Sequence, residues 1–352
     1  MADWTSSMQQ TFEYYVVDPG TWKDVRKVDT VRSCTISWDW ESSTLSTATF
    51  NITESLGECY LRIYLITIQN GIREKHPLGT YIVQTPTTVF NGKVQDVTTD
   101  AYSPLLELRE NPPPYGYSIL KGSNIMEDAY LLTQEHARAP VVRTECETTI
   151  CYDFISDTED TWLSFLTDYI LNANYLYSLD EMGRILFAPK QETASLQPVW
   201  AFTDDNSSIL QPSVTMSHDI YGIPNVVEVI YSNGSEFFYA QAVNDDPNSP
   251  ISTISRGRKI THRVTDPEIA GNPTEEQIKE YAERTLKEMS SVEYTVTYTH
   301  GYCPVRVGDC VTLNYARAGL KNVKARVTNQ SIICETSCQV EETAVYTTNL
   351  WR

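Results

Sequence analysis

Alternating hydrophobic and polar residues dominate the first hundred positions of the chain. The runs 35–40 and 47–53 alternate with a period of two and are rich in β-branched and aromatic residues, as strands with one buried face are. A longer apolar run covers 58–68, Asn70-Gly71 follows it as a hairpin signal, and a further strand is predicted at 78–84. The pattern predicts an antiparallel sheet, in the form of a small barrel or a sandwich.

The pattern changes after residue 102. Three consecutive prolines at 112–114 forbid helix and favour a stiff, irregular connector. Residues 122–138 are predicted as a short helix and 143–153 as a strand. A hairpin turn at 180–184 precedes a predicted strand at 185–187. This part of the chain therefore indicates a mixed α/β insert.

Two longer amphipathic helices are predicted further along. Ser156 and Glu159 have the spacing of a capping box, so the first helix is expected to begin there. Its apolar face comprises Trp162, Phe165, Leu166, Tyr169, Ile170 and Ala173. The second helix is expected to open at 272–274, with Gln277 three residues after Thr274. Its buried face comprises Ile278, Tyr281, Ala282, Leu286 and Met289. A strand at 225–231, which ends at the turn Asn233-Gly234, lies between them.

The C-terminal part returns to a β pattern. Residues 294–299 alternate, 302–307 read as a strand, and 310–315 read as a second strand after a Gly-Asp turn. Two more strand-like runs follow, up to Trp351. Within this unit we expect Gly308 and Asp309 to set the turn after Pro304, and we expect one packed face on the strand that follows. The residues of that face are Val311, Leu313 and Tyr315.

Length and charge limit the number of domains and the classes of partner that the chain is expected to bind. A chain of 352 residues is expected to divide into about two to four domains. Hydrophobic and aromatic contents of 41% and 11% are those of a globular protein. The net charge of -19 argues against specific nucleic-acid binding and against an anionic membrane surface. The N-terminus has no pattern of a secretory signal, and no apolar run approaches the ~20 residues of a membrane span, so we expect synthesis in a cytosol and no membrane insertion.

The eight cysteines do not form a metal-binding framework in the sequence. Cys334 and Cys338 would lie about 13 Å apart on one continuous strand, too far for a shared metal or a disulfide. If 335–337 is instead a tight hairpin, the two become neighbours across strands and are able to pair. Small buried thiols are the favoured interpretation over a zinc site.

No motif of a hydrolase, a nucleotide-binding loop or a zinc protease is found. His218-Asp219 could orient a base, with Cys146 or Cys151 as the nucleophile, but the sequence offers no sign that they meet. Polar loop residues and buried thiols are the favoured interpretation, and we predict no catalytic residue, cofactor or metal site.

The acidic clusters have structural explanations as well. Asp157, Glu159 and Asp160 could form a carboxylate pair for glycoside hydrolysis, but acids also favour a helix N-terminus. Calcium binding at 204–206 is the weaker interpretation there, because the loop lacks the Gly and Glu of a calcium-binding loop. The basic run 256–259 is interpreted as a solvated loop or a salt-bridging contact.

Several segments together resemble the baseplate hub family of tailed bacteriophages, which includes the hubs of the T-even phages and of phage Mu and hub-like proteins of defective Bacillus prophages. The segments are 221–229, then a capped helix, then 299–309, with 103–108 followed by 121–123, and 180–187. The resemblance covers about two thirds of the chain. It rests on the order and spacing of common β motifs, not on one diagnostic motif.

The resemblance implies an α+β, mainly β fold: two tail-tube-like β-barrel domains with a mixed α/β insert between them. The expected domains are a first barrel at 1–108, the insert at 109–200, a β-rich segment at 201–270 that partly completes the barrels, and a helix plus the second barrel at 271–352. The family carries no catalytic residues that could be transferred to this chain.

The resemblance also implies a structural virion protein, assembled in the host bacterial cytoplasm, that forms a homotrimer at the phage tail tip or baseplate. Three chains with two barrels each would match a hexameric tail tube and line part of the DNA channel. The implied partners are the tail tube or distal tail protein and the central spike or fibre protein, with the tape measure protein as a further candidate. The alternatives are a receptor- or carbohydrate-binding module that uses aromatic side chains for stacking, and a cell-wall hydrolase.

Overall fold

The computed structural model of the chain describes residues 2–92, 94–205, 208–232, 237–265, 267 and 273–351. Strands make up 49% of it and helices 15%, so the predicted mainly β class is confirmed. The chain forms two compact units. Unit 1 comprises Met1–Val214 and Tyr298–Ala344, and unit 2 comprises Thr215–Thr297 and Val345–Arg352. The predicted limits of the four domains stay predictions.

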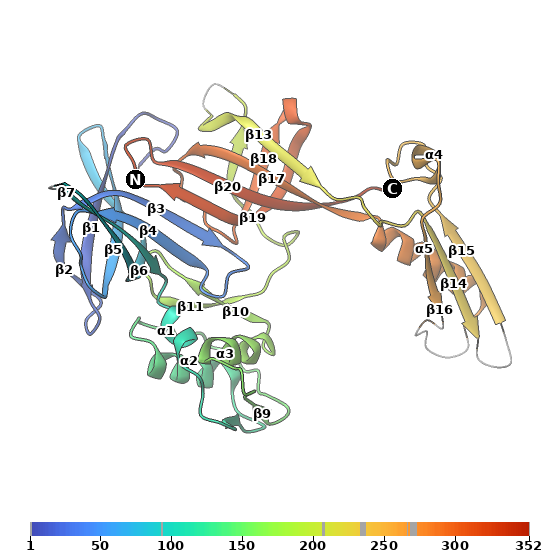
Figure 1. Cartoon of the computed structure of the whole chain (residues 1–352). Coiled ribbons are helices and arrows are strands. Elements are labelled where there is room, and N and C mark those ends of the chain that lie inside the picture. Colours follow the sequence, from blue (N-terminus) through green and yellow to red (C-terminus); the bar gives the residue numbers. More distant parts are fainter. Residues whose placement is uncertain are drawn as a thin grey trace. The chain divides into compact units, whose positions relative to one another are not determined.

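The N-terminal strands form the antiparallel sheet that the alternating pattern predicts (Figure 1). They are β1 (Gln9–Asp18), β2 (Lys23–Val28), β3 (Val31–Asp39), β4 (Ser46–Ile52), β5 (Cys59–Gln69), β6 (Ile72–Asn91) and β7 (Val94–Tyr102). The hairpin signal is confirmed, because Asn70 and Gly71 connect β5 to β6 with positive φ angles of 53° and 78°. Such a two-residue turn matches the twist of the flanking strands.

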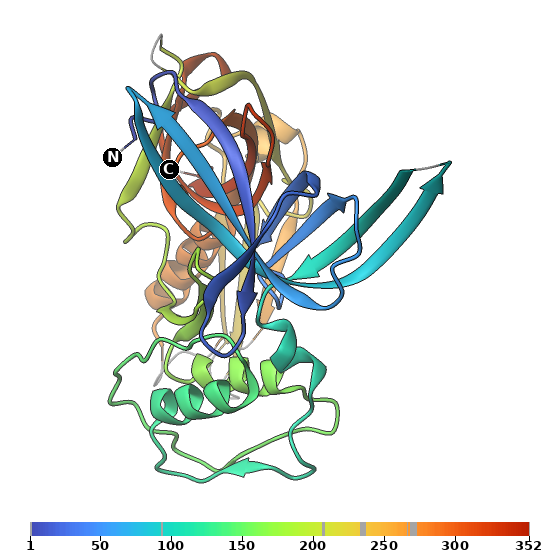
Figure 2. The same ribbon diagram turned by 90° about the vertical axis from the view of Figure 1, so that its left-hand side faces the viewer.

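The β6–β7 hairpin extends beyond the rest of this sheet (Figure 2). The pairing of β6 with β5 ends at Val83, and the strand then continues to Asn91 with β7 as its partner. Val89 and Phe90, near its tip, are 57% and 75% exposed.

The C-terminal strands join the same sheet. They are β12 (Pro198–Thr203), β13 (Leu210–His218), β17 (Ser291–Gly301), β18 (Cys310–Tyr315), β19 (Leu320–Ile333) and β20 (Gln339–Asn349), with a short 3-10 helix η1 (Ala316–Ala318). The order is β13-β17-β20-β19-β3-β4-β7-β6-β5-β1-β2, and β18 pairs with both β12 and β19. In the described residues this order does not close into a barrel.

The connection between the two groups of strands is the antiparallel pairing of β3 with β19. Ile36 lies directly opposite Ile332, and both side chains are buried in the same core. Each fully buried side chain of this size contributes about 1.5–3 kcal/mol. The core contains Tyr14, Cys34, Phe50, Leu61, Ile63, Leu65, Val97, Cys334, Cys338 and Val340 as well.

The insert between β7 and β12 carries the helices of unit 1, with α2 and α3 beside each other (Figure 2). Its elements are α1 (Leu106–Glu110), β8 (Ser118–Ile119), α2 (Ile125–His136), β9 (Phe154–Ile155), α3 (Trp162–Leu171), β10 (Tyr175–Leu179) and β11 (Ile185–Pro189). The irregular proline segment, the helix at 122–138 and the strand at 185–187 are confirmed. The face of α3 is buried as predicted from Trp162 to Ile170, whereas Ala173 lies beyond the end of the helix.

Three local predictions are wrong. Residues 143–153 do not form the predicted strand. Thr149 forms an isolated bridge with Asn124, without a continuous run of paired residues. Residues 302–307 are irregular, since β17 already ends at Gly301. The capping box of α3 is formed by Thr161 and Ser164, five residues after the predicted Ser156.

Unit 2 is a three-stranded sheet with one long helix against it. Its elements are β14 (Val226–Ser232), β15 (Phe237–Val243), α4 (Thr253–Arg256), β16 (Thr261–Thr265) and α5 (Glu275–Met289), with the strand order β15-β14-β16. Thr274 and Gln277 form the predicted capping box. Ile278, Ala282 and Leu286 are fully buried in a core with Val227 and Val229, whereas the predicted Tyr281 and Met289 are only partly buried. The predicted turn Asn233-Gly234 lies outside the described residues, as does Asn272.

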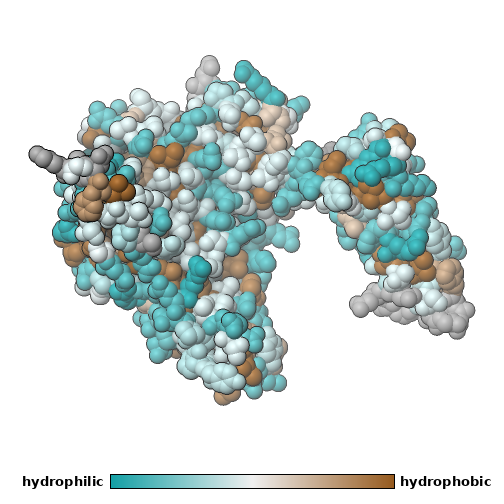
Figure 3. All heavy atoms as spheres, viewed as in Figure 1, coloured by the Kyte–Doolittle hydropathy of each residue, from teal (hydrophilic) through white to brown (hydrophobic). Residues whose placement is uncertain are grey.

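Hydrophobic residues on the face drawn in Figure 3 form small, separate patches among hydrophilic ones. Among the described residues, no helix combines the length and the apolar character that crossing a bilayer requires.

The capping box of α3 provides a test of the fold. Replacing Thr161 with Ala removes the oxygen that accepts from the Ser164 amide, so we expect a loss of about 1 kcal/mol in the free energy of unfolding. Ser156→Ala is the matched control, because Ser156 lies outside the box, and we expect less than about 0.5 kcal/mol. Urea unfolding followed by circular dichroism measures both. Equal losses in the two variants would contradict the assignment of the cap.

Candidate functional site

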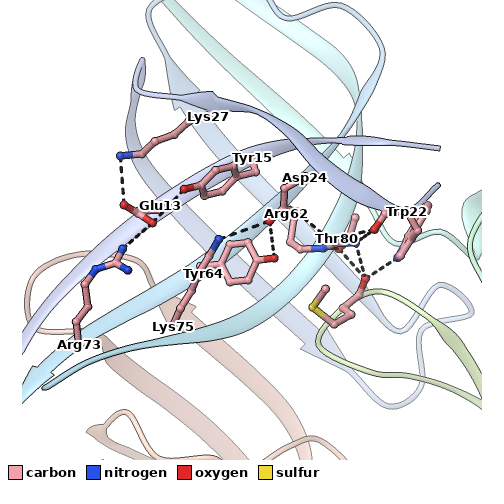
Figure 4. Close-up of polar contacts among 11 residues, drawn as sticks. Glu13, Tyr15, Trp22, Asp24, Lys27, Arg62, Tyr64, Arg73, Lys75 and Thr80 are labelled. Carbon is pink, nitrogen blue, oxygen red and sulfur yellow. Dashed lines mark hydrogen bonds and ion pairs between the residues drawn. The ribbon is translucent and has the colours of Figure 1, made fainter. Parts of the chain in front are cut away.

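A buried arginine connects the N-terminal sheet to the insert (Figure 4). Arg62, in the middle of β5, is 1% exposed. Its Nε donates to Thr80 Oγ1 at 2.8 Å and its Nη1 donates to Asp24 Oδ1 at 2.9 Å. The guanidinium also donates to the carbonyls of Trp22 and Met182, at 3.3 and 3.2 Å. Arg62 therefore meets the requirement that a buried charge be paired and hydrogen-bonded.

The Met182 carbonyl is the point where the insert meets this arginine. It accepts from Trp22 Nε1 at 2.8 Å and from Thr80 Oγ1 at 2.9 Å, in addition to Arg62. Met182 lies in the 180–184 turn between β10 and β11, which Asp180 orders by accepting from two backbone amides of the turn. Gly183 follows with φ +74°, and a Cβ there would lie 2.6 Å from Thr80 Cβ. The turn approaches the sheet this closely only because residue 183 is a glycine.

A chain of charges continues from Asp24 along the sheet surface (Figure 4). Tyr64 Oη donates to Asp24 Oδ2 at 2.8 Å, and burial together with this hydrogen bond raises the pKa of Tyr64 to about 12. Lys75 Nζ lies 3.5 Å from Asp24 Oδ2 and over the rings of Tyr64 and Tyr15, at 3.6 and 4.0 Å from their centroids. Cation–π contacts of this kind hold the ammonium in place.

Glu13 lies at the other end of this network of charged residues. Its carboxylate lies 3.3 Å from Lys27 Nζ and 3.0 Å from Arg73 Nη2. Burial alone would raise the pKa of Glu13, but Lys27, Arg73 and the Tyr15 hydroxyl together lower it. Every charged group of this network has a partner within the network, so the arrangement holds these elements together.

A second buried cluster, in the C-terminal strands, has the order of a catalytic triad. Cys303 Sγ lies 3.8 Å from His300 Nδ1, and His300 Nε2 lies 3.4 Å from Glu342 Oε1 without the alignment of a hydrogen bond. Glu342 accepts from Tyr298 Oη and from Gln330 Nε2, both at 2.7 Å. The sequence search missed this cluster, because its members come from β17, β19, β20 and the segment after β17.

Burial excludes a nucleophilic role for this cluster. His300 and Glu342 are 0% exposed and Cys303 is 1% exposed. Burial, and then the charge of Glu342, raise the pKa of the Cys303 thiol, whereas a nucleophilic cysteine needs a lowered pKa and access to its substrate. We interpret the cluster as a buried polar network that fixes the packing of these strands.

His218, Asp219, Cys146 and Cys151, whose role as a base and a nucleophile was not the favoured interpretation of the sequence, do not meet one another in their observed contacts. His218 stacks on Tyr294 with ring centroids 4.4 Å apart, and Asp219 accepts from the Tyr221 amide. Cys146 donates to Thr148 Oγ1 at 3.2 Å, and Cys151 is exposed.

The loop at 204–206, for which calcium binding was the weaker interpretation, and the basic run 256–259 have local partners. Asp205 accepts from Thr203 Oγ1, and Asn206 lies outside the described residues. Arg256, in the basic run, donates to the carbonyls of Ile220 and Ile223. No group of three or more acidic, histidine or cysteine side chains that could hold a metal occurs in the described part of the chain.

The carboxylates near α3 divide into two roles. Asp160 accepts from the Asp157 amide and from Ser164 Oγ, so it supports the start of α3. Glu159 lines a cavity of about 540 Å³ together with Trp40, Arg109 and Asp168. Burial, and then the charge of Asp160, raise the pKa of Asp168. A cavity of this size, lined by two aromatic side chains and a few charged groups, is suited to a small polar ligand.

The C-terminal turn singled out from the sequence borders a second cavity, of about 290 Å³. Its lining includes Pro304, Gly308 and Asp309, together with Tyr177 and Leu186 of the insert. Gly308 has φ +94°, and a Cβ there would lie 2.6 Å from Trp40 Cζ3. Asp309 Oδ2 accepts from the Arg306 amide at 2.9 Å, and the Arg306 side chain forms an ion pair with Glu181. The turn thus contacts both the first sheet and the insert.

The strand after this turn, β18, has a paired strand on each edge. β18 pairs parallel with β12 and antiparallel with β19. Val311 and Leu313 are buried, and Tyr315 is partly exposed and donates from its hydroxyl to the Pro212 carbonyl at 2.8 Å. Their proposed role within a second barrel stays a prediction.

Two solved structures of tail proteins and one chain of a protein complex share this fold over almost the whole of this chain. A tail protein from Neisseria meningitidis is 12% identical, with a TM-score of 0.60 over 97% of this chain and 98% of that one. A 43 kDa tail protein of prophage MuSo2 from Shewanella oneidensis is 9% identical, with a TM-score of 0.60 over 95% and 98%. A chain of the Francisella PdpA-VgrG complex is 9% identical, with a TM-score of 0.53 over 97% of this chain and 58% of that one.

The chain therefore has the fold of these tail proteins, as the resemblance predicted, whereas the two barrels that the resemblance also implied are not confirmed. No protein-family model and no curated protein sequence matches the chain.

The buried arginine provides the test of the site. Arg62→Met removes the buried donor to Asp24 Oδ1 and one of the three donors to the Met182 carbonyl, while Lys75 stays beside Asp24, so we expect a loss of about 3 kcal/mol in the free energy of unfolding. The matched control is Arg32→Met, which removes an exposed ion pair with Asp96 and should cost less than about 1 kcal/mol. Urea unfolding of both variants measures the difference. A cost for Arg62→Met no larger than that of the control would show that the junction is not needed for stability.

Proposed function

We propose that the chain is the hub protein of a phage tail tip or baseplate, a structural protein of the virion without enzymatic activity. The observation that carries the proposal is the fold shared with two tail proteins, one of them from a prophage, over at least 95% of this chain and 98% of each of theirs. The buried Arg62 junction and the more exposed Arg306–Glu181 ion pair support a structural role, because their charged groups link the insert to the strands of unit 1.

In this proposal the hub is a homotrimer. Each chain contributes two tail-tube-like barrels, one from the strands β1 to β7 and one from the C-terminal strands, so that three chains present six barrels to a hexameric tube. The exposed β6–β7 hairpin, with Val89 and Phe90 near its tip, supports contact with a neighbouring subunit. The residues Pro304, Gly308, Asp309, Val311, Leu313 and Tyr315 would form the turn and strand of the second barrel.

The proposed partners are the tail tube or distal tail protein on one side and the central spike or fibre protein on the other, with the tape measure protein as a further candidate. One similar structure is a complex with a second protein, which supports the expectation of a protein partner. The net charge of -19 is consistent with a channel through which DNA passes without binding, because a phosphate backbone binds cationic surfaces.

The mass in solution tests the proposal. Three chains of 40.0 kDa give 120 kDa, so we expect multi-angle light scattering at micromolar concentration to report a species of that mass. A second measurement is the position of the chain in images of the intact particle, where we expect threefold symmetry at the tail tip. A protein that stays monomeric at high concentration and is absent from purified particles would refute the hub.

A second candidate function is the binding of a carbohydrate in the cavity beside Trp40. Its indole, Glu159, Asp168 and Arg109 combine a stacking surface with groups that bind hydroxyls. The lining also includes Ser42, Ser43, Thr161, Ser164 and Thr167. A cell-wall hydrolase would use two of the three carboxylates that line the same cavity, Glu41, Glu159 and Asp168, so one set of variants examines both activities.

For this alternative we expect Asp168→Asn to weaken binding of cell-wall glycan fragments at least about tenfold, because a hydrogen bond to a charged group contributes about 1.5–3 kcal/mol. Isothermal titration with fragments of stated composition measures the affinity, and release of reducing ends measures hydrolysis. Asp157→Asn is the control, since Asp157 is not among the residues that line the cavity. If the wild-type protein binds no fragment and releases no reducing ends, the alternative is rejected and the hub proposal is unaffected.

A further inference from the structure

Three cysteines of unit 1 are buried in the core that joins β3 to the end of β19. Cys34, Cys334 and Cys338 are 2%, 5% and 0% exposed, and all three belong to the same hydrophobic cluster. Cys34 lies in β3, whereas Cys334 and Cys338 flank the turn between β19 and β20. The residues come from opposite ends of the chain, 334 − 34 = 300 positions apart for the first pair.

Cys34 and Cys334 are directly opposite each other across the two strands. The register pairs Ile332 with Ile36 and Ile333 with Thr35, and the Cys334 amide continues it by donating to the Cys34 carbonyl at 2.9 Å. Opposed residues of a hydrogen-bonded antiparallel pair have Cα atoms about 5.5 Å apart, within the range that a disulfide spans. Their side chains point to the same face of the sheet, into the core that also holds Ile36 and Ile332.

We propose that Cys34 and Cys334 form a disulfide when the protein folds in the presence of a disulfide oxidant, and that this bond joins β3 to the end of β19.

The reaction is ordinary thiol–disulfide exchange. One protein thiol loses its proton and attacks a sulfur of oxidised glutathione, whose S–S bond breaks and releases one glutathione. The second protein thiolate then attacks the protein sulfur of this mixed disulfide, and the second glutathione leaves. Two protein thiols thus lose two protons and two electrons, and one oxidised glutathione becomes two reduced ones.

Burial decides when this reaction occurs. The interaction of Cys334 with the Cys34 thiol, followed by burial, raises the pKa of Cys334, and burial raises the pKa of Cys338. A buried thiol with a raised pKa reacts slowly, because the thiolate is the attacking form and the oxidant has to reach it. Oxidation is therefore expected during folding, while β3 and β19 are still accessible, and the finished disulfide is expected to be shielded from reductants.

The neighbouring cysteines provide controls for specificity. Cys338 follows a turn in which its amide donates to the Glu335 carbonyl, so a Cys334–Cys338 bond is the competing product. Cys303 contacts His300, and Cys310 interacts with the Val311 carbonyl. Cys151 is exposed and supplies a control for surface oxidation.

The experiment refolds the wild-type protein from urea, once with a reduced and oxidised glutathione mixture and once with excess reductant. After alkylation in denaturant, the intact mass counts the remaining thiols: 8 after reduction, and 8 − 2 = 6 after oxidative refolding. Peptide mapping should find the peptide with Cys34 linked to the peptide with Cys334. Cys338→Ser and Cys151→Ser should keep this link, and Cys334→Ser should lose it.

Two further measurements complete the test. Oxidation of the already folded, reduced protein should be at least about tenfold slower than oxidation during refolding. The oxidised protein should unfold at a temperature about 5 °C or more above that of the reduced protein, because the bond closes a very long loop in the unfolded chain. A link between Cys334 and Cys338, or refolding to the native circular dichroism spectrum in the oxidising mixture with all thiols free, would overturn the proposal.

Discussion

The pairing of β3 with β19 is the interaction on which unit 1 depends. Without it, the strands β1 to β7 and the strands β17 to β20 would be two separate sheets, each with an unpaired edge. The pairing buries Ile36 against Ile332 and forms the core that contains the thiols of Cys34 and Cys334. The C-terminal turn strengthens the same junction, because Gly308 packs against Trp40, which follows β3 directly in the chain.

The second junction, at Arg62, links the insert to the N-terminal sheet, as the β3–β19 pairing links the C-terminal strands to it. One guanidinium satisfies Asp24, Thr80 and a carbonyl of the insert at the same time. A charge that needs several partners fixes geometry more strictly than an apolar contact, since an unmet partner is costly in the interior. A protein whose task is to keep several binding surfaces in register has a use for such rigidity, which agrees with the proposed role as a hub.

Local patterns in the sequence predict what local physics controls. The capping box of Thr274 and Gln277 and the turn at Asn70-Gly71 are correct, because each depends only on neighbouring residues. The predicted start of α3 is wrong, since Thr161 and Ser164 form the capping box instead of Ser156 and Glu159. The sequence pattern alone does not tell which of two neighbouring capping boxes forms. The burial of Arg62 could be predicted from the sequence. The residue interrupts a run that is apolar at odd and even positions alike, which indicates that both faces of β5 are buried. Its partner at Met182 could not be predicted, because a backbone carbonyl has no signature in the sequence.

The long-range pairing also has a consequence for synthesis. Asn329 pairs with Asp39, so the ribosome adds 329 − 39 = 290 residues after one edge before its partner exists. At a translation rate of about 5–20 residues per second, the edge of β3 that contains Ile36 stays unpaired for roughly 15–60 s. Nascent chains on neighbouring ribosomes of one messenger carry the same edge. Production of this protein therefore depends on how well the cell keeps those chains apart until the last strands emerge.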